Sequence, residues 1–504
     1  MVDVCVYFLS SILAWYSFKN LSHHSTRIMM GGNDIRRDFI RNSGPIAHEI
    51  VLAACVTFVN LIVLFITYDG RHYLELPSSP MQTLIIIITA MMAVVLIWRH
   101  YIYNRMHTEW EDRHGRKEHS NDSFMRLLFP YWYRLSCGLM FFGNCMLPMQ
   151  FLFSNNLLDP ETGDPYQFNI ICALCYGFVF TMIGLHILAD STIFIAQKLF
   201  GWTTLWQQLR IIYSRRRWCH FRAPLVFLLS AKIVLGGALI AKEDPIVVQI
   251  TVPISHHLPH SLENFRIIQL SDVHIGVTIG RTRVKKIVEI VNDLCSGIDD
   301  KCGLIALTGD VVDGEPQGLM KAIEPLKNLC PDDDVPKVFV PGNHEHIHFI
   351  VDHVVTVLSE VGIDSLLNDN IRLPINEVRD NQLVVVGLDD LSSRRYRGKE
   401  NEAFDGIDAD VDVTLLLAHQ PNHLKVAESY GVDLMLSGHT HAGQFFPGTV
   451  VAWLFNSRFS GYYPSRARGE TAVYVSAGTL FWGPPVRFST RHHEITDIRL
   501  VRSQ

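Results

Sequence analysis

Arg266-Ile-Ile-Gln-Leu-Ser-Asp-Val-His274 is a short apolar run that ends directly in a carboxylate and an imidazole. Four later runs have the same form, at residues 303–307, 338–340, 413–417 and 433–436, and each leads into a motif that contains Asp, Asn or His. Such short runs are typical of strands that are buried on both faces of a sheet. The pattern predicts an α/β domain in which polar side chains gather at the carboxyl ends of the strands.

The segments between these runs have a different periodicity. Residues 281–295, 317–329 and 346–361 carry apolar side chains at helical spacing. The C-terminal half of the chain is therefore predicted to repeat one unit, a strand followed by a polar loop and a helix.

Five polar motifs follow the predicted strands. In chain order they are Asp272-Val-His274, Gly309-Asp-Val-Val-Asp313, Gly342-Asn-His-Glu345, Ala418-His419 and Gly438-His-Thr-His441. They supply carboxylates, an amide oxygen and imidazoles, which suit a pair of divalent metal ions. One Asp-x-His pair alone is more often a capping or surface feature. Glycine in front of the ligands allows a close backbone approach, and all five motifs in this order indicate a metal site.

The order of the motifs resembles that of the calcineurin-like metallophosphoesterases. The resemblance continues through His439-Thr-His-Ala-Gly-Gln444 and Pro485-Val-Arg-Phe488, which look like a bacterial membrane-associated phosphodiesterase subgroup and its animal transmembrane relatives. It extends over residues 247–500 and implies a C-terminal α/β four-layer sandwich. We place this catalytic domain at residues 246–504, with residues 242–245 as the boundary.

The resemblance also implies a set of metal ligands and catalytic residues. The ligands are Asp272, His274 and His441 for one ion, Asn343, His419 and His439 for the second, and Asp310 as the bridge between the two. Two divalent ions, Mn, Fe or Zn, would supply a bridging hydroxide that attacks phosphorus. His344 would protonate the leaving group, and Asp313 would orient its imidazole. The alternative for Asp313 is a carboxylate at a helix N-terminus.

Two departures from related enzymes bear on the substrate. Gly314-Glu315 stands where the protein Ser/Thr phosphatases usually have arginine, which argues against phosphoprotein substrates. Ala477 stands where arginine is expected in the bacterial relatives. Arg394-Arg395-Tyr396-Arg397 is a candidate to bind phosphate in its place, and a solvated basic loop is the alternative.

The N-terminal half has a membrane-like composition. Mean hydropathy of the whole chain is +0.16 although 19% of its residues are charged. Residues 46–67, 81–98, 136–153, 168–189 and 223–241 are each about long enough to cross a bilayer core of ~30 Å. Residues 4–18 form a shorter apolar segment, either a signal-anchor or an interfacial helix. We therefore predict a polytopic α-helical membrane region over residues 1–245, with five to six helices in the lipid bilayer.

Loop charge predicts the orientation of this region. The loops 19–45, 99–135 and 190–222 carry five, seven and six Lys or Arg residues, whereas 68–80 carries one and 154–167 none. Positive loops remain cytoplasmic, so the catalytic domain is predicted to be lumenal or extracellular, and the sequons at Asn20 and Asn121 to be unglycosylated. Lys232 opposes this prediction, since it lies near the middle of the last span.

Cysteine and charge content add further expectations. Cys295, Cys302 and Cys330 are the cysteines of the catalytic half, and Cys302 could pair with Cys330 in an oxidising compartment. A net charge of −6 without a long basic stripe argues against a nucleic-acid partner and against a nuclease.

The sequence thus predicts a membrane-anchored, metal-dependent phosphoester hydrolase. Membrane anchoring favours a phosphodiesterase that acts on a lipid-linked or small phosphodiester. The alternative is a transporter, channel or scaffold in which the phosphoesterase domain is regulatory, although the intact ligand set favours an enzyme. Metal identity, oligomeric state and the choice between monoesters and diesters stay open.

Overall fold

The computed structural model describes residues 158–503, apart from 201–214, 255–257, 298–301, 333, 348–349, 375–381, 394–397, 408–410 and 466–469. The chain divides into two compact units, Met1–Phe141 and Phe142–Gln504. The predicted segments at 4–18, 46–67, 81–98 and 136–153 and both sequons lie outside the described residues.

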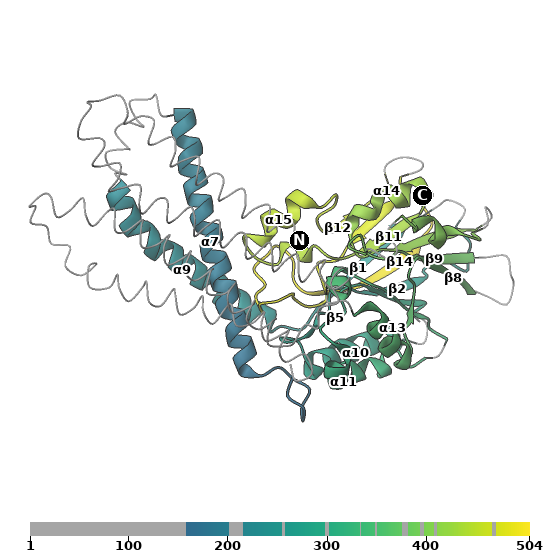
Figure 1. The fold of residues 1–504 in the computed structure, drawn as a ribbon. Helices are drawn as coiled ribbons and strands as arrows, with labels where there is room; N and C mark the ends of the chain where they lie inside the picture. Colours follow the sequence, from purple (N-terminus) through teal and green to yellow (C-terminus); the bar gives the residue numbers. More distant parts are fainter. Residues whose placement is uncertain are drawn as a thin grey trace, which may run out of the picture. The chain divides into compact units, whose positions relative to one another are not determined.

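Two long helices precede the α/β domain within the second unit. They are α7 (Gln167–Phe200) and α9 (Arg215–Ala241), which pack side by side (Figure 1). Within the described residues, α7 is the one helix long and apolar enough to cross a membrane, through Gln167–Ala189. The apolar part of α9, Leu225–Ala241, is shorter, and Lys232 is exposed on it. Of the two predicted spans that the structure describes, only 168–189 corresponds to a helix that is long and apolar enough to cross a membrane, and the multi-span topology stays a prediction.

The first sheet of the domain is mixed. Its six strands, in spatial order, are β1 (Ile246–Pro253), β14 (Glu494–Val501), β2 (Arg266–Leu270), β4 (Leu304–Thr308), β6 (Lys337–Val340) and β7 (Asp364–Ser365). Strands β2, β4, β6 and β7 are parallel, and β14 runs antiparallel to β2. The carboxyl ends of β2, β4 and β6 therefore meet at one edge.

The second sheet is also six-stranded and mixed. Its order is β12 (Gly461–Tyr463), β13 (Ala472–Val475), β11 (Leu434–Ser437), β10 (Val413–Leu417), β9 (Gln382–Gly387) and β8 (Asp369–Pro374). Strands β9, β10, β11 and β13 are parallel, with β8 and β12 antiparallel at the two ends. A short pair, β3 (Ile275–Gly276) and β5 (Val312–Asp313), lies outside both sheets.

Alternate side chains of each strand enter different hydrophobic cores. Ile267 of β2 and Leu415 of β10 belong to the same core, which draws side chains from both sheets. Ile268 joins the core that includes α10 (Arg281–Cys295), α11 (Pro316–Ile323) and α13 (Val351–Glu360), while Leu416 joins the core that includes α14 (Leu424–Ser429) (Figure 1). Both faces of each central strand are thus buried, which explains the unbroken apolar runs in the sequence.

The predicted strands and helices are largely confirmed. Strands β2 and β10 have the predicted bounds, β6 begins one residue earlier than predicted, and β4 and β11 are each shifted by one residue toward the C-terminus. Residues 317–329 form two helices rather than one, because a 3-10 helix, η1 (Glu324–Asn328), with Pro325 in its first turn, follows immediately after α11. A short helix α12 (Asn343–Ile347) precedes α13.

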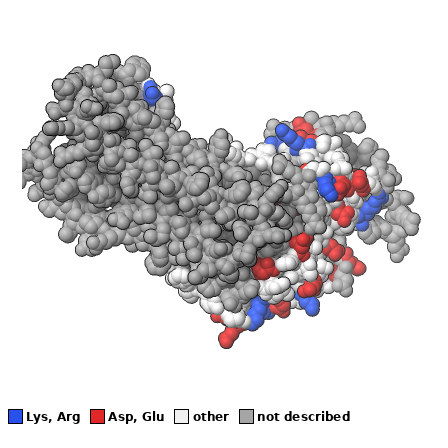
Figure 2. All heavy atoms as spheres, viewed as in Figure 1, with Lys and Arg blue, Asp and Glu red and all other residues white. Residues whose placement is uncertain are grey.

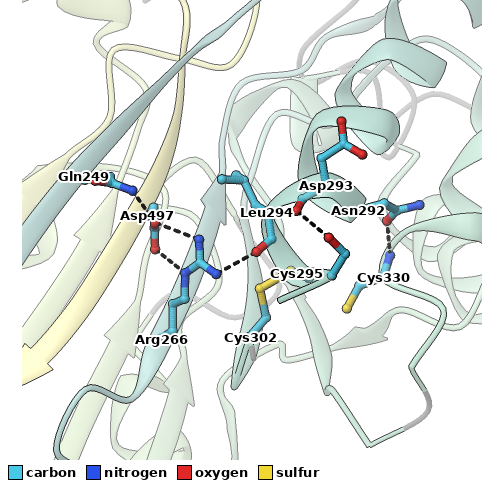
Figure 3. Close-up of a disulfide and its surroundings, with 10 residues drawn as sticks. Gln249, Arg266, Asn292, Asp293, Leu294, Cys295, Cys302, Cys330 and Asp497 are labelled. Atoms are coloured by element: carbon cyan, nitrogen blue, oxygen red, sulfur yellow. Dashed lines mark hydrogen bonds and ion pairs between the residues drawn. A yellow bond between two sulfur atoms is a disulfide. The ribbon is translucent and has the colours of Figure 1, made fainter. Parts of the chain in front are cut away.

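The predicted cysteine pairing is wrong. Cys302 is bonded to Cys295 at the end of α10, and Cys330 is a free, buried thiol (Figure 3). Cys330 lies beside Asn292 instead, whose side-chain oxygen accepts a hydrogen bond from the backbone N–H of Cys330 at 2.7 Å. Cys302 is only seven positions after Cys295 in the chain, and Cys295 is the last residue of α10, which ends close to the start of β4.

The same region contains a buried ion pair between neighbouring strands. Arg266 of β2 donates through Nε and Nη2 to the carboxylate of Asp497 on β14, at 2.7 and 2.8 Å (Figure 3). Its Nη1 donates to the carbonyl oxygen of Leu294, next to the disulfide. One guanidinium therefore ties two strands to the end of α10, with charge-assisted bonds of the stronger kind.

Candidate metal centre

The polar motifs converge where the carboxyl ends of two sets of parallel strands meet. Asp272 and His274 follow β2, Asp310 follows β4, and Asn343 follows β6. From the second sheet, His419 follows β10, and both His439 and His441 follow β11. Three groups of these side chains have ligand atoms close enough to hold a metal ion: Asp272, His274 and His441; Asp310, His419 and His439; and His274, Asp313 and His344.

Asp310 lies at the centre of the group. Its Oδ2 is 3.1 Å from His419 Nε2 and 3.8 Å from His274 Nε2, so one carboxylate oxygen faces histidines from both sheets. Asn343 Oδ1 is 3.2 Å from His419 Nε2 on the same side. This is the position expected of a bridging carboxylate, which has lone pairs for two cations.

The other half of the site is built around Asp272. Its Oδ1 lies 3.2 Å from His441 Nε2 and 3.9 Å from His274 Nε2. The two imidazole nitrogens are themselves 2.9 Å apart. Ser271 Oγ donates to the other carboxylate oxygen at 2.6 Å and fixes its direction.

The backbone takes unusual conformations to direct these side chains inward. Asp272, His274, Asp310, His439 and His441 all have positive φ, between 50° and 69°. Non-glycine residues in this region cost conformational energy and concentrate at functional sites. Periodicity and composition carry no signal for this feature.

Two glycines permit close approach between motifs, as expected. A Cβ on Gly342 would lie 2.2 Å from Asp310 Oδ1, and a Cβ on Gly438 would lie 2.2 Å from Asp272 Oδ2. Any larger residue would collide with a carboxylate of the site. The expectation that glycine precedes the polar residues for steric reasons is borne out at both positions.

Asp313 contacts two histidines rather than one. Its Oδ1 lies 2.7 Å from His344 Nδ1 and 2.9 Å from His274 Nδ1. The rings of His274 and His344 are 4.8 Å apart and nearly perpendicular. The helix-terminal alternative for Asp313 is wrong, since α11 begins at Pro316 and its N-cap residue is Glu315.

Glu345 is a supporting residue to which the sequence analysis assigned no role. Its fully buried carboxylate accepts four backbone N–H groups, those of Asp310, Val311, Val312 and Gly342, at 2.7–3.1 Å. It therefore holds the loop after β4 against the loop after β6. Glu345 is part of the motif Gly342-Asn-His-Glu345, so the residue itself was visible in the sequence. Its role was not, because its partners are backbone N–H groups, which every residue type except proline has.

The outer nitrogens of the histidines are also held in place. His419 Nδ1 lies 2.8 Å from the carbonyl oxygen of Thr308, and a proton there leaves Nε2 with its lone pair facing Asp310 and Asn343. The Asp313 contact has the same effect on His274. Such partners on the far side of an imidazole orient it for a metal ion.

Electrostatics in the site favour positive charge. Burial opposes ionisation, yet His419 and His344 hold the pKa of the Asp310 carboxyl well below its usual range. Burial likewise opposes protonation of His344, but Asp313 and Asp310 raise its pKa to about 9. Burial lowers the pKa of His439 to about 4, which keeps that ring neutral. The carboxylates of Asp272 and Asp310, the inward lone pair of His419 and the neutral ring of His439 suit a pair of divalent cations.

Arg487 is a second supporting residue. Its side chain is buried and donates to the carbonyl oxygens of His441, Ala477 and Leu480, at 3.0, 2.8 and 2.9 Å. The guanidinium of Arg487 thus binds the backbone of Ala477, ten residues earlier, and fixes the backbone of His441. The candidate phosphate binder Arg394–Arg397 lies outside the described residues.

The edge of the site contains an aromatic side chain that the sequence analysis did not single out. The ring of Trp482 lies 5.7 Å from that of His344, edge to face. Gln444 holds it in place, since its Oε1 accepts from the backbone N–H of Trp482 at 2.8 Å and its Nε2 donates to the Trp482 carbonyl oxygen at 2.9 Å. Trp482 therefore borders the catalytic candidate His344.

Comparison with known proteins agrees with this site. The sequence model of the calcineurin-like phosphoesterases matches residues 265–443. A transmembrane protein with metallophosphoesterase domain from Bos taurus is 33% identical over 67% of this chain and 74% of its own length. One of the same description from Danio rerio is 35% identical over 55% of this chain and 62% of its own length. An uncharacterized metallophosphoesterase from Helicobacter pylori is 32% identical over 47% of this chain and 60% of its own length.

The fold and the clustered His and Asp groups define a metal-dependent phosphoesterase domain, in which the two clusters around Asp272 and Asp310 are candidates for a binuclear metal centre. The chain belongs to the calcineurin-like metallophosphoesterase family, and relatives within it are described as transmembrane proteins.

Proposed function

We propose that this protein is a membrane-anchored phosphodiesterase that hydrolyses a lipid-linked or small phosphodiester with two divalent metal ions. The observation that carries the proposal is the position of Asp310, whose Oδ2 faces histidines from both sheets within 4 Å. All seven predicted ligands meet around this carboxylate and Asp272, and a decayed site would have lost members of the set.

The proposed ligands divide into two groups that share Asp310. Asp272, His274 and His441 hold one ion, and Asn343, His419 and His439 hold the other. When bound, such ions polarise phosphoryl oxygens and lower the pKa of water enough to supply hydroxide near neutral pH. The three cores packed on the two sheets support the four-layer sandwich expected for this site.

His344 acts as the proton donor to the leaving oxygen. Its Nε2 lies 4.0 Å from Asp310 Oδ2, at the edge of the metal centre, while Nδ1 faces Asp313. Asp313 and Asp310 keep the imidazole protonated at neutral pH by raising its pKa. A charged imidazole with one ring nitrogen held by a carboxylate and the other directed at the reaction is suited to general acid catalysis.

The catalytic domain faces a lumen or the cell exterior. The alternating charge of the loops supports this orientation, and the Cys295–Cys302 disulfide adds an independent argument, because disulfides persist in oxidising compartments. On the face that Figure 2 shows, acidic and basic side chains are interspersed among the described residues. This mixture favours a small or lipid-linked substrate over a nucleic acid.

The full chain, tested with nitrophenyl esters, alkyl phosphoesters and lipid phosphodiesters, checks the proposed reaction. We expect metal-dependent hydrolysis of diesters. His344→Ala should slow the alkyl esters far more than the nitrophenyl esters, by ~10²–10⁴-fold, since a poor leaving group needs the proton. A metal-loaded wild type that hydrolyses none of these esters would favour the alternative of a scaffold or transporter.

Glycosylation tests the proposed orientation. A sequon introduced between Ser392 and Glu402 should be glycosylated in the full chain, whereas the native Asn121 should not. Protease digestion of the catalytic domain in sealed microsomes without detergent would instead place it in the cytosol and return cytosolic phosphoesters to the substrate list.

A further inference from the structure

The two proposed halves of the metal centre carry unequal negative charge. The first ion has Asp272 as a carboxylate of its own and shares Asp310 with the second. The second ion has only the shared carboxylate, because its other ligands, Asn343, His419 and His439, bind as neutral groups. A cation in a buried site is stable only when nearby negative charge compensates it. The second half of the centre therefore has one carboxylate fewer than the first.

Two buried carboxylates follow strand β9, beside the strand that presents His419. Strands β9 and β10 are parallel neighbours, and at their carboxyl ends the N–H of Leu388 donates to the carbonyl oxygen of Leu417 at 3.0 Å. Asp389 and Asp390 come next on one strand, and His419 comes next but one on the other. Both carboxylates are buried. They therefore lie at the same sheet edge as the ligands of the second ion.

The charge of Asp389 is matched by a histidine. His346 Nε2 lies 2.5 Å from Asp389 Oδ1. Burial lowers the pKa of His346, but its bond to Asp389 raises that pKa above the usual value. Since His346 belongs to α12, as Asn343 does, the pair also ties the loop after β6 to the loop after β9. Asp389 thus has a cationic partner of its own.

The partners of Asp390 are neutral. Its Oδ1 accepts from the backbone N–H and the Oγ of Ser392, at 2.8 and 2.6 Å. Both of its carboxylate oxygens accept from Gln420 Nε2, at 2.9 and 3.0 Å. Within the part of the chain that the structure describes, no cationic side chain is bonded to it. Because Gln420 directly follows His419, this unmatched carboxylate is attached to the residue next to a ligand.

The charge of Asp390 acts on both imidazoles of the second half. Burial lowers the pKa of His419, whereas carboxylates that include Asp310 and Asp390 raise it well above the usual range. Burial and His419 lower the pKa of His439, and Asp390 is among the carboxylates that oppose this shift. A carboxylate that favours a proton on a ring also favours a metal ion on that ring, because both are positive charges.

We propose that Asp390 balances the charge of the second metal ion from outside the ligand set, and that Gln420 holds it in place behind His419. Its donors are neutral, so its full negative charge is available to the nearest cation, and in a buried site such a charge acts over several ångströms. Asp390 is thus a positioning residue that acts without touching the ion. The inference rests on the proposed division of the ligands, but not on the proposed reaction or substrate.

Mn²⁺ titration of the full chain in nanodiscs, followed by calorimetry, tests this role. Asp390→Asn removes the charge, and its amide oxygen can still accept from Ser392. We expect the affinity for one of two ions to fall ~10–100-fold, as for other residues that support metal ligands. Asp390→Ser, which also removes the charge, should have the same effect. Unchanged affinities in both variants would overturn the inference, and so would a wild type that binds a single ion.

Asp433→Asn is the matched control. Asp433 is a partly buried carboxylate that also accepts a backbone N–H, that of Thr414 at 2.8 Å, but it precedes β11 and so lies at the opposite end of that strand from the site. Its substitution should change neither Mn²⁺ affinity. Thermal unfolding separates metal binding from folding, since Mn²⁺ should raise the Tm of Asp390→Asn less than that of Asp433→Asn. Equal increases in Tm would contradict the role of Asp390.

Combination with ligand variants identifies the ion. His439→Ala removes a ligand of the second ion, and His441→Ala removes one of the first. Asp390→Asn should weaken the ion that remains in His441→Ala by ~10–100-fold and change little in His439→Ala, because residues that act on one ion are not additive. The reverse pattern would assign Asp390 to the first ion and refute the proposal. If the wild type binds two ions but hydrolyses no phosphodiester, the proposed reaction fails, while the titrations still decide the role of Asp390.

Discussion

Glu345→Gln should destabilise the domain and its metal centre together. The two carboxylate oxygens of Glu345 divide four backbone donors between them: Oε1 accepts from Val311 and Val312, and Oε2 accepts from Asp310 and Gly342. Glutamine has nearly the same shape, but its amide nitrogen cannot accept a hydrogen bond. Two buried N–H groups would lose their acceptor whichever way the amide is turned.

The size of the effect follows from the number of bonds lost. Hydrogen bonds to charged groups contribute about 1.5–3 kcal/mol each, so two of them amount to ~3–6 kcal/mol. Burial and the nearby Asp310 raise the pKa of the Glu345 carboxyl, so the substitution also removes a buried charge and the lower end of the range applies. A loss of ~3 kcal/mol corresponds to a fall in Tm of roughly 6–12 °C for a domain of this size.

Thermal unfolding of the full chain in nanodiscs, followed with and without added Mn²⁺, measures this change. We expect the Tm of the variant to fall by that amount and its metal affinity to fall too, because Asp310 and Asn343 sit on the two loops that Glu345 joins. Glu263→Gln is the matched control. Glu263 accepts the backbone N–H of Arg502 at the surface, and exposed changes usually stay within ~0.5 kcal/mol. If Glu345→Gln and Glu263→Gln have the same Tm and the same metal affinity, Glu345 does not hold the loops after β4 and β6 together.

Four further substitutions separate the remaining roles in the site. Asp310→Asn should abolish hydrolysis and release metal, whereas His344→Ala should keep both ions; metal analysis of the two purified variants checks this difference. Asp313→Asn removes the negative charge that raises the pKa of His344, so His344 should lose its proton at lower pH. The alkaline limb of the pH–rate profile should therefore move to lower pH. If the alkaline limb of the pH–rate profile does not move, Asp313 does not control the protonation of His344 during catalysis. Arg487→Met leaves the carbonyl oxygen of His441 without its buried donor. Titration with Mn²⁺ should then show weaker binding of one ion, and two unchanged affinities would argue against this role.

Much of the catalytic domain could be predicted from the sequence, because its central strands are buried on both faces. Such strands read as short apolar runs, and the chain reverses direction immediately after each one, so the polar residues at the ends of β2, β4, β6, β10 and β11 had to lie at sheet edges. The order of the five motifs, which resembles that of the calcineurin-like metallophosphoesterases, then pointed to a metal site. Helix bounds were less certain where a proline lies in the first turn of a new helix, as Pro325 does in η1.

The supporting contacts of the site could not be predicted in the same way. Glu345 binds backbone N–H groups, and Arg487 binds carbonyl oxygens, and every residue type offers the same backbone groups. The positive φ of Asp272 and of the other site residues is imposed by the surrounding packing. The cysteine pairing depended on where α10 ends in space, which placed Cys295 rather than Cys330 beside Cys302.

The sequence by itself determined the residue types of the metal centre, their order and the strands that present them, because burial and ligand chemistry both leave a record in side chains. Tertiary structure alone decided that Asp313 contacts two histidines, that Glu345 and Arg487 hold the ligand loops, and that the segment around Arg487 contacts α7 and α9. These are contacts between residues far apart in the chain. Their geometry is fixed by how the sheets and helices pack, and no local pattern encodes it.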